Sequence, residues 1–148
     1  MPAAKPIPDG YHSLTPYLIV AGAAAAVAFY QKAFGATERL RMNKPDGRIG
    51  HAEIQIGDSV VMLADEHPEI SAFGPGHYGG ASVSFVIYVA DCDALYRRAL
   101  AAGATSEREP TDQPYGDRMA GVRDSFGYTW WLATHIKDVP AEELAKMG

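Results

Sequence analysis

The chain has 148 residues, of which 47% are hydrophobic and 21% charged, a composition that excludes a disordered chain. Its 13 Lys and Arg against 18 Asp and Glu leave a formal net charge of -5, without the basic excess of a nucleic-acid-binding surface. No apolar run reaches the roughly 18 residues that a membrane helix requires, and the N-terminus lacks the apolar core of a secretory signal. The single cysteine, Cys92, excludes an internal disulfide and a Cys-based zinc site. We therefore expect a cytoplasmic protein that binds neither nucleic acid nor membranes.

The first half of the chain predicts a strand, a helix and three further strands. Ahead of these elements, Pro2, Pro6 and Pro8 predict that the chain begins with an extended, poorly ordered arm. The segment SLTPYLIV, residues 13–20, is short and apolar and has β-branched residues at its end, which indicates a strand. The Ala-rich run at 23–34 is followed by a glycine and predicts a helix. Turn residues then separate three strands, expected at 37–42, 48–56 and 59–64.

The second half repeats this order after a Gly-rich segment, residues 65–80, that we expect to be a linking loop. The segment SVSFVIYV at 82–89 predicts a strand, and Asp91 predicts the N-cap of a helix that ends at residue 102. Cys92 follows this cap and is interpreted as an ordinary helix residue. Three more strands are expected at 105–109, 117–124 and 128–134, and a short terminal helix is expected from Pro140.

Both halves thus read β-α-β-β-β, and Gly-Ala-Thr follows the helix in each, at 35–37 and at 103–105. A unit of this size does not bury a sheet face on its own. The repeat therefore predicts an α+β fold in which two tandem βαβββ units form a curved eight-stranded mixed sheet with helices on its convex face. We expect one domain over residues 1–148, with unit one at 13–64, unit two at 82–134 and a tail at 135–148.

The two-residue turn Gly57–Asp58 predicts which side chains share a face of the sheet. A hairpin of this length pairs Glu53 with Met62. It also predicts the pairs Ile56–Ser59, Ile54–Val61 and His51–Ala64. Because side chains alternate along a strand, we expect an apolar face under the helices, made by Ile54, Ile56, Val61 and Leu63. The opposite, more polar face carries His51, Glu53, Gln55 and Met62, with Thr15 and Tyr17 on the first strand and Ser84 and Tyr88 on the fifth.

His51 and Glu53 are the candidate catalytic residues, because they lie two apart on one strand and project together. A His/carboxylate pair can act as acid and base. The same pair together with Gln55 is also compatible with a displaced metal site. A polar pair on a half-exposed sheet face, without function, is the third interpretation.

Further candidates for ligand binding lie in both halves. Tyr115 directly precedes Gly116 at a turn, and Arg118 comes two residues after this glycine. The Arg118 guanidinium is suited to a carboxylate or phosphate-like oxygen. The competing interpretation is a salt-bridged turn in which Asp117 pairs with Arg123, a residue that we also count as a ligand-binding candidate. An aromatic wall for a flat ligand is predicted from Tyr17, Met62, Tyr88 and Trp131, although the same residues suit an ordinary core. We expect Trp130 beneath a helix and His12, His77 and His135 in solvent.

Five segments of the chain resemble the vicinal oxygen chelate superfamily, which includes glyoxalase I, bleomycin-resistance proteins, fosfomycin-resistance enzymes and extradiol dioxygenases. They are TPYLIV, AAAAVAFYQKAFGA, GRIGHAEIQIGDSVVMLADE, DQPYGDR and VRDSFGYTWWLATH. The resemblance covers roughly residues 12–138 and is most similar to the PhnB-like subgroup. It implies the duplicated βαβββ fold and a site in the cup of the sheet. It does not by itself imply one reaction, since one fold carries many chemistries.

The resemblance also implies four positions for metal ligands in that cup, which by position are Thr15, Met62, Ser84 and Trp131. Two hydroxyls, a thioether and an indole are poor ligands for divalent cations, which prefer imidazole, carboxylate or thiolate. We therefore predict no metal and no cofactor. Metal-free bleomycin-resistance proteins sequester a drug, and in this respect the chain resembles them.

Three functions follow as expectations. The first is a small-molecule-binding protein with a metal-free cup that sequesters a drug or metabolite. The second is a lyase or isomerase of the glyoxalase type that uses His51 and Glu53 as acid and base. The third is an interaction module without a ligand. The resemblance further implies a homodimer.

Overall fold

The computed structural model describes residues 3–148, so Pro2 of the expected arm lies outside the described residues. The chain divides into two compact units, one up to Gly80 and one from Ala81 onwards. The division follows the end of the segment that was expected to link the two repeats. Each unit is described by itself.

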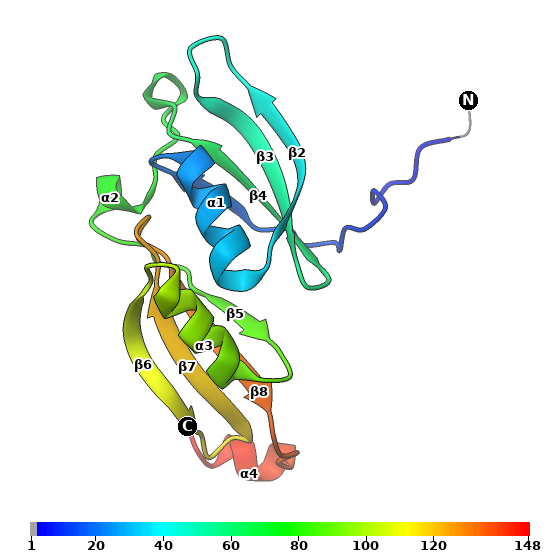
Figure 1. Ribbon diagram of the computed structural model, residues 1–148. Helices are drawn as coiled ribbons and strands as arrows, with labels where there is room; N and C mark the ends of the chain where they lie inside the picture. Colours follow the sequence, from blue (N-terminus) through cyan, green and yellow to red (C-terminus); the bar gives the residue numbers. More distant parts are fainter. Residues whose placement is uncertain (1–2) are drawn as a thin grey trace. The chain divides into compact units, whose positions relative to one another are not determined.

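Unit 1 is a four-stranded mixed sheet with one helix packed on one of its faces (Figure 1). The strand order is β1-β4-β3-β2, in which β1 runs parallel to β4 and the other neighbours are antiparallel. Two short helical segments follow the sheet, in the region that was expected to be a loop. The elements are β1 (Tyr17–Val20), α1 (Ala23–Phe34), β2 (Thr37–Asn43), β3 (Ile49–Ile56), β4 (Ser59–Asp65), the 3₁₀ turn η1 (Pro68–Ile70) and α2 (Pro75–Tyr78).

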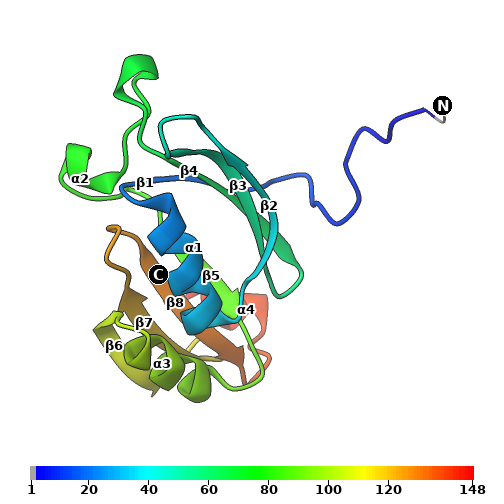
Figure 2. The same ribbon diagram turned by 45° about the horizontal axis from the view of Figure 1, so that its top comes forward.

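Unit 2 repeats the same plan with the strand order β5-β8-β7-β6 (Figure 2). Here β5 runs parallel to β8, and the other pairs are antiparallel. The elements are β5 (Phe85–Tyr88), α3 (Cys92–Ala101), β6 (Thr105–Asp112), β7 (Asp117–Arg123), β8 (Thr129–His135) and α4 (Ala141–Ala145). The predicted α+β class, with two βαβββ units and eight strands, is confirmed, and the eight strands hydrogen-bond as two mixed sheets of four.

The predicted register of the β3–β4 hairpin is confirmed. Ile56 pairs with Ser59, Ile54 with Val61 and Glu53 with Met62. The face that was expected to be apolar is buried, as its four members Ile54, Ile56, Val61 and Leu63 show. Because α1 packs against this buried face, the opposite face of the sheet is open and carries His51 and Glu53.

Three predicted strand boundaries are wrong. The first strand begins at Tyr17 rather than at residue 13, and the fifth spans Phe85–Tyr88 rather than 82–89. β6 continues to Asp112, beyond the expected turn from Pro110. This is possible because β6 is an edge strand, where a residue without a backbone N–H is tolerated. No helix within residues 3–148 is long and apolar enough to cross a membrane.

The N-terminus of α1 is capped by a carboxylate from a distant strand. Its own N-cap residue, Gly22, has no side chain to offer. Asp65, the last residue of β4, accepts the backbone N–H groups of Gly22 and Ala23 at 3.1 and 2.7 Å with Oδ1, and that of Ile49 at 2.7 Å with Oδ2. One side chain thus joins α1, β3 and β4, and satisfies amides that a helix terminus otherwise leaves unpaired.

In unit 2, a chain of hydrogen-bonded side chains joins β5, β7, β8 and the segment that follows β8. The Tyr88 hydroxyl donates to Asp117 Oδ2 at 2.7 Å. His135 Nδ1 lies 2.8 Å from Asp117 Oδ1, and its Nε2 lies 2.7 Å from Asp138 Oδ1. Both bonds raise the pKa of His135 above its ordinary 6.5, and the bond to Asp138 contributes most. His135 is exposed at the end of β8, as predicted, and both of its ring nitrogens are bonded.

We predict that Asp65→Ala lowers the opening free energy of the α1 N-terminus by about 1–2 kcal/mol, because it removes the carboxylate that accepts the Gly22 and Ala23 amides. Native-state hydrogen exchange of those amides and of Ile49 measures the effect. Asp65→Asn keeps one acceptor oxygen and is expected to lose less. Wild-type protection in the Ala variant would contradict this role.

We predict that His135 stabilises unit 2 only while it is protonated, since a single neutral imidazole cannot donate to two carboxylates. Its pKa is raised in the folded chain, so the contribution is fully present below pH 6.5 and is lost as the pH rises through the raised value. Urea unfolding should therefore show a wild-type advantage over His135→Gln that shrinks with rising pH, and NMR titration should place the His135 pKa above 6.5. An advantage that grows with pH would contradict the assignment.

Candidate functional site

Unit 1 contains a pocket of about 510 Å³ between the chain ahead of β1 and the open face of the sheet. Most of its wall comes from the segment ahead of β1, residues 3–16, which we call the arm. Its Pro-rich start was predicted as extended and poorly ordered, and its residues from 13 onwards as part of the first strand. The arm contributes Pro6, Ile7, Pro8, Tyr11, His12, Ser13 and Thr15, and the sheet contributes Glu53 of β3 and Met62 of β4. The pocket combines apolar surface with hydroxyl groups and one carboxylate.

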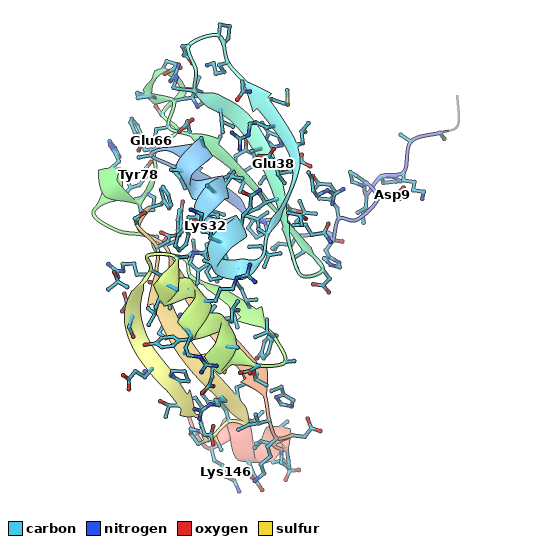
Figure 3. All side chains as sticks on the ribbon, in the orientation of Figure 1. Asp9, Lys32, Glu38, Glu66, Tyr78 and Lys146 are labelled. Carbon is cyan, nitrogen blue, oxygen red and sulfur yellow. The ribbon has the colours of Figure 1, made fainter. Side chains whose placement is uncertain are left out.

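Several contacts hold the arm against the sheet. The Tyr11 amide closes a turn on the Pro8 carbonyl at 3.1 Å. The Arg39 guanidinium of β2 lies 5.2 Å from the centre of the Tyr11 ring and donates to the Asp9 carbonyl at 3.4 Å. Asp9 is labelled in Figure 3 on this arm. The backbone turns at Gly10 with a φ of +82°, and a Cβ there would approach Arg39 Nη1 to 2.9 Å. Only glycine suits this turn, because other residues are strained at such a φ and would displace Arg39.

Four side chains on the open face form one hydrogen-bonded chain that ends in the pocket. The Tyr17 hydroxyl lies 2.8 Å from His51 Nδ1, and His51 Nε2 lies 2.8 Å from Glu53 Oε2. The Tyr11 hydroxyl donates to the other oxygen, Glu53 Oε1. The carboxylate only accepts, so His51 carries a hydrogen on Nε2, and a neutral imidazole then accepts the Tyr17 hydrogen at Nδ1. The chain therefore reads Tyr17 to His51 to Glu53, with Tyr11 donating from the opposite side.

These bonds decide which members of the chain are charged. The hydrogen bond from Tyr11, followed by the one from His51, holds the pKa of Glu53 below its ordinary 4.5 despite partial burial. Burial and the neighbouring carboxylate raise the pKa of both Tyr11 and Tyr17 above 10.0. At neutral pH the pocket thus contains an ionised Glu53 and two neutral phenols.

The other sequence-predicted residues of unit 1 lie near this network but differ in their contacts. Thr15 and Met62 line the pocket. Tyr17 is half exposed and joins the network through His51. The Gln55 side chain donates to the Gly57 carbonyl at 3.1 Å, at the β3–β4 turn. Gln55 therefore belongs to the hairpin rather than to the group around Glu53.

The predicted residues of unit 2 form contacts of their own. Both Arg118 Nε and Nη2 donate to the Asp93 carboxylate, at 2.7 and 2.9 Å, and Nη1 donates to Asp112 at 2.9 Å. These ion pairs raise the pKa of Arg118 and occupy the fork that was expected to hold a ligand oxygen. The alternative pair of Asp117 with Arg123 is wrong, because Arg123 pairs with Glu107 at 2.8 Å.

The remaining aromatic candidates lie on the open face of the unit 2 sheet or beside it. Tyr88 is exposed and bonded to Asp117, and the Arg108 guanidinium lies 5.6 Å from the Trp131 ring centre. The Tyr115 hydroxyl lies 3.5 Å from the Met119 sulfur. Ser84 precedes β5 and is exposed. Trp130 is buried as predicted, and its indole N–H donates to Asp124 at 2.9 Å. Cys92 is the first residue of α3 and is buried, which raises its pKa above 9.0.

The donor chemistry does not fit a divalent metal at the positions that the resemblance implies. Unit 1 offers the Thr15 hydroxyl and the Met62 thioether, and unit 2 offers the Ser84 hydroxyl and the Trp131 indole. Elsewhere within residues 3–148, no group of three or more His, Cys, Asp or Glu side chains is placed to hold a metal ion. His51 and Glu53 offer two ligating groups, and each is already bonded to the other.

Sequence reasoning missed Tyr11, which closes the network on Glu53. The two residues are 42 positions apart, and neither local spacing nor strand alternation relates them. A Tyr after a glycine in a Pro-rich segment carries no signal for such a contact.

Among known proteins, the chain is 40% identical over 135 residues to the uncharacterized protein Rv0887c of Mycobacterium tuberculosis, covering 89% of this chain and 79% of that protein. It is 25% identical over 150 residues to protein YjdN of Escherichia coli, covering 87% and 99%. Among solved structures, TioX from Micromonospora sp. ML1 matches with a TM-score of 0.67 and 28% identity, over 84% of this chain and 99% of that one. Protein PA1353 from Pseudomonas aeruginosa matches in fold with a TM-score of 0.68 at 21% identity, over 85% and 99%.

The family model for the glyoxalase/bleomycin resistance protein/dioxygenase superfamily matches residues 11–132. The match covers both βαβββ units and begins at the tyrosine that closes the network on Glu53. The chain belongs to the glyoxalase/bleomycin resistance protein/dioxygenase superfamily.

Proposed function

We propose that this protein binds a small organic molecule in the pocket of unit 1 and sequesters it without a metal ion. The observation that supports this most is the pocket of about 510 Å³ between the arm and the sheet. Its volume lies in the range of small-molecule sites, roughly 300–1,000 Å³. Apolar walls with a few placed polar groups are the usual composition of such sites.

The hydrogen bonds of Glu53, which lies on the floor of the pocket at its sheet side, and those of His51 favour binding over catalysis. Both carboxylate oxygens of Glu53 already accept hydrogen bonds, and both ring nitrogens of His51 are bonded. The lowered pKa of Glu53 makes it a weak base. A network in which each donor has an acceptor shapes a rigid surface and offers no poised proton donor.

We predict that the neutral fluorophore N-phenyl-1-naphthylamine binds one-to-one and that chelation by EDTA leaves its affinity unchanged, since no metal takes part. Thr15→Trp places an indole in the pocket and is expected to weaken binding about tenfold or more. A tenfold loss of affinity corresponds to roughly 1.4 kcal/mol of binding free energy. Fluorescence titration measures both affinities. Thr111→Trp, on the exposed edge strand β6, is the matched control and should bind as the wild type does. Absence of binding, or equal affinity of the Thr15→Trp variant, would refute the pocket.

The second candidate is a lyase or isomerase of the glyoxalase type with His51 and Glu53 as acid and base. It is favoured by the order of groups on the open face, hydroxyl, imidazole and carboxylate, with 2.8 Å between Tyr17 and His51 and between His51 and Glu53. In this order the imidazole can take the Tyr17 proton while the carboxylate stabilises the resulting imidazolium.

The two functions differ in what happens to the hemithioacetal of methylglyoxal and glutathione. We expect no isomerisation above the buffer rate by the wild-type protein, because sequestration leaves the bound molecule unchanged. Absorbance of the thioester product measures it. Turnover that is present in the wild type and absent in folded His51→Ala would favour the enzyme and overturn sequestration.

We also propose a homodimer, the assembly that is frequent in this superfamily. Sedimentation velocity at micromolar concentration should then show a single species of twice the chain mass. A monomeric species at that concentration would refute the dimer and leave the pocket of unit 1 untouched.

A further inference from the structure

The hydrogen atoms of the network all point toward Glu53. With a neutral imidazole that carries its hydrogen on Nε2, Tyr17 donates to His51, and both His51 and Tyr11 donate to the Glu53 carboxylate. None of these polar hydrogens is left to point into the pocket. The network itself therefore offers the pocket acceptors: a carboxylate has about four lone-pair positions, of which two are occupied here, and the Tyr11 hydroxyl oxygen keeps its own lone pairs. The Ser13 and Thr15 hydroxyls elsewhere in the lining can donate as well as accept.

The charge in the pocket is negative, and it therefore favours the same kind of ligand as the acceptors do, a cation that donates hydrogen bonds. Among the lining residues within 3–148, Glu53 is the only carboxylate, and no Lys or Arg side chain is among them. Arg39 is the nearby cation, but its guanidinium is directed to the Tyr11 ring and the Asp9 carbonyl. The imidazole of His12 is bonded to the Asp58 carbonyl at 3.1 Å. The Glu53 side chain is 15% exposed, so solvent screens its charge incompletely.

We propose that the pocket of unit 1 selects organic cations, with an ammonium or amidinium group against Glu53 and the Tyr11 oxygen and an apolar body against the arm. This rests on the proposed binding function and names its ligand class. Pro6, Ile7, Pro8 and Met62 supply the apolar contact. An anion meets the like charge of Glu53, and a neutral alcohol meets acceptors without the charge-assisted bond.

Three probes of one shape separate these cases: 1-naphthylmethylammonium, 1-naphthylmethanol and 1-naphthoate. Displacement of N-phenyl-1-naphthylamine at low ionic strength gives their affinities. We expect the ammonium to bind about tenfold tighter than the alcohol, the magnitude of one hydrogen bond to a charged group. The carboxylate should bind most weakly of the three. Equal affinities in the wild type would overturn the inference.

Glu53→Gln is expected to reduce the preference of ammonium over alcohol to about twofold or less, because a neutral amide replaces the charge. Glu142→Gln is the matched control, since it removes one negative charge from the exposed helix α4 and should keep the wild-type preference. A preference that persists in Glu53→Gln would show that Glu53 does not select the cation. A preference that falls equally in Glu142→Gln would show that overall charge selects it. Either result would contradict the inference.

Tyr11→Phe provides a test that keeps the carboxylate. It removes one donor from Glu53 Oε1 while leaving the ring under Arg39. The ammonium preference should stay clearly above the level of Glu53→Gln, because the carboxylate charge remains although the Tyr11 oxygen is lost. A fall to the Glu53→Gln level would contradict a role for the charge.

Failure of the ligand class and failure of the pocket give different results. If N-phenyl-1-naphthylamine binds and the three naphthalenes compete equally, the pocket stands and cation selection is wrong. If the fluorophore fails to bind the folded wild type, the binding function itself is wrong.

Discussion

The Glu53 carboxylate is the group on which the architecture of the pocket depends. A half-buried charge must be compensated by hydrogen bonds, and here two donors from different parts of unit 1 meet on it, Tyr11 from the arm and His51 from β3. The bond from Tyr11 joins a Pro-rich segment with no strand pairing of its own to the open face of the sheet. The same bond lowers the pKa of the carboxylate and keeps it charged at neutral pH. One interaction therefore positions the pocket wall and sets its charge.

Unit 2 builds a related chain from the same kinds of side chain in a different order. There the carboxylate of Asp117 lies between a phenol, Tyr88, and an imidazole, His135. In unit 1 the imidazole lies between the phenol Tyr17 and the carboxylate. In both units α1 or α3 covers one face of the sheet, so polar chains of this kind are confined to the other face. The duplicated fold thus repeats the surface on which chemistry is placed, and the individual residues decide what that surface does.

The chain also shows how a superfamily associated with metal chemistry can offer a surface for organic ligands. Hydroxyl, thioether and indole groups occupy the positions where the resemblance implies metal ligands, and two of them, Thr15 and Met62, line the pocket of unit 1. These groups are weak ligands for hard or borderline cations, but they make good apolar and hydrogen-bonding walls. The ion pairs of Arg118 with Asp93 and Asp112 have a structural explanation, since they join α3 to β6 and β7.

The sequence by itself determined the features that depend on neighbouring residues. The bounds of α1, the Asp91 cap of α3 and the register of the β3–β4 hairpin follow from periodicity, capping chemistry and a two-residue turn. Only the tertiary structure decided the contacts between distant positions. Tyr11 meets Glu53 across 42 residues, and Arg118 meets Asp93 across 25. Such partners are chosen by how the segments pack, because a side chain several ångströms long can reach many neighbours, and no local pattern states which one the fold places within its reach.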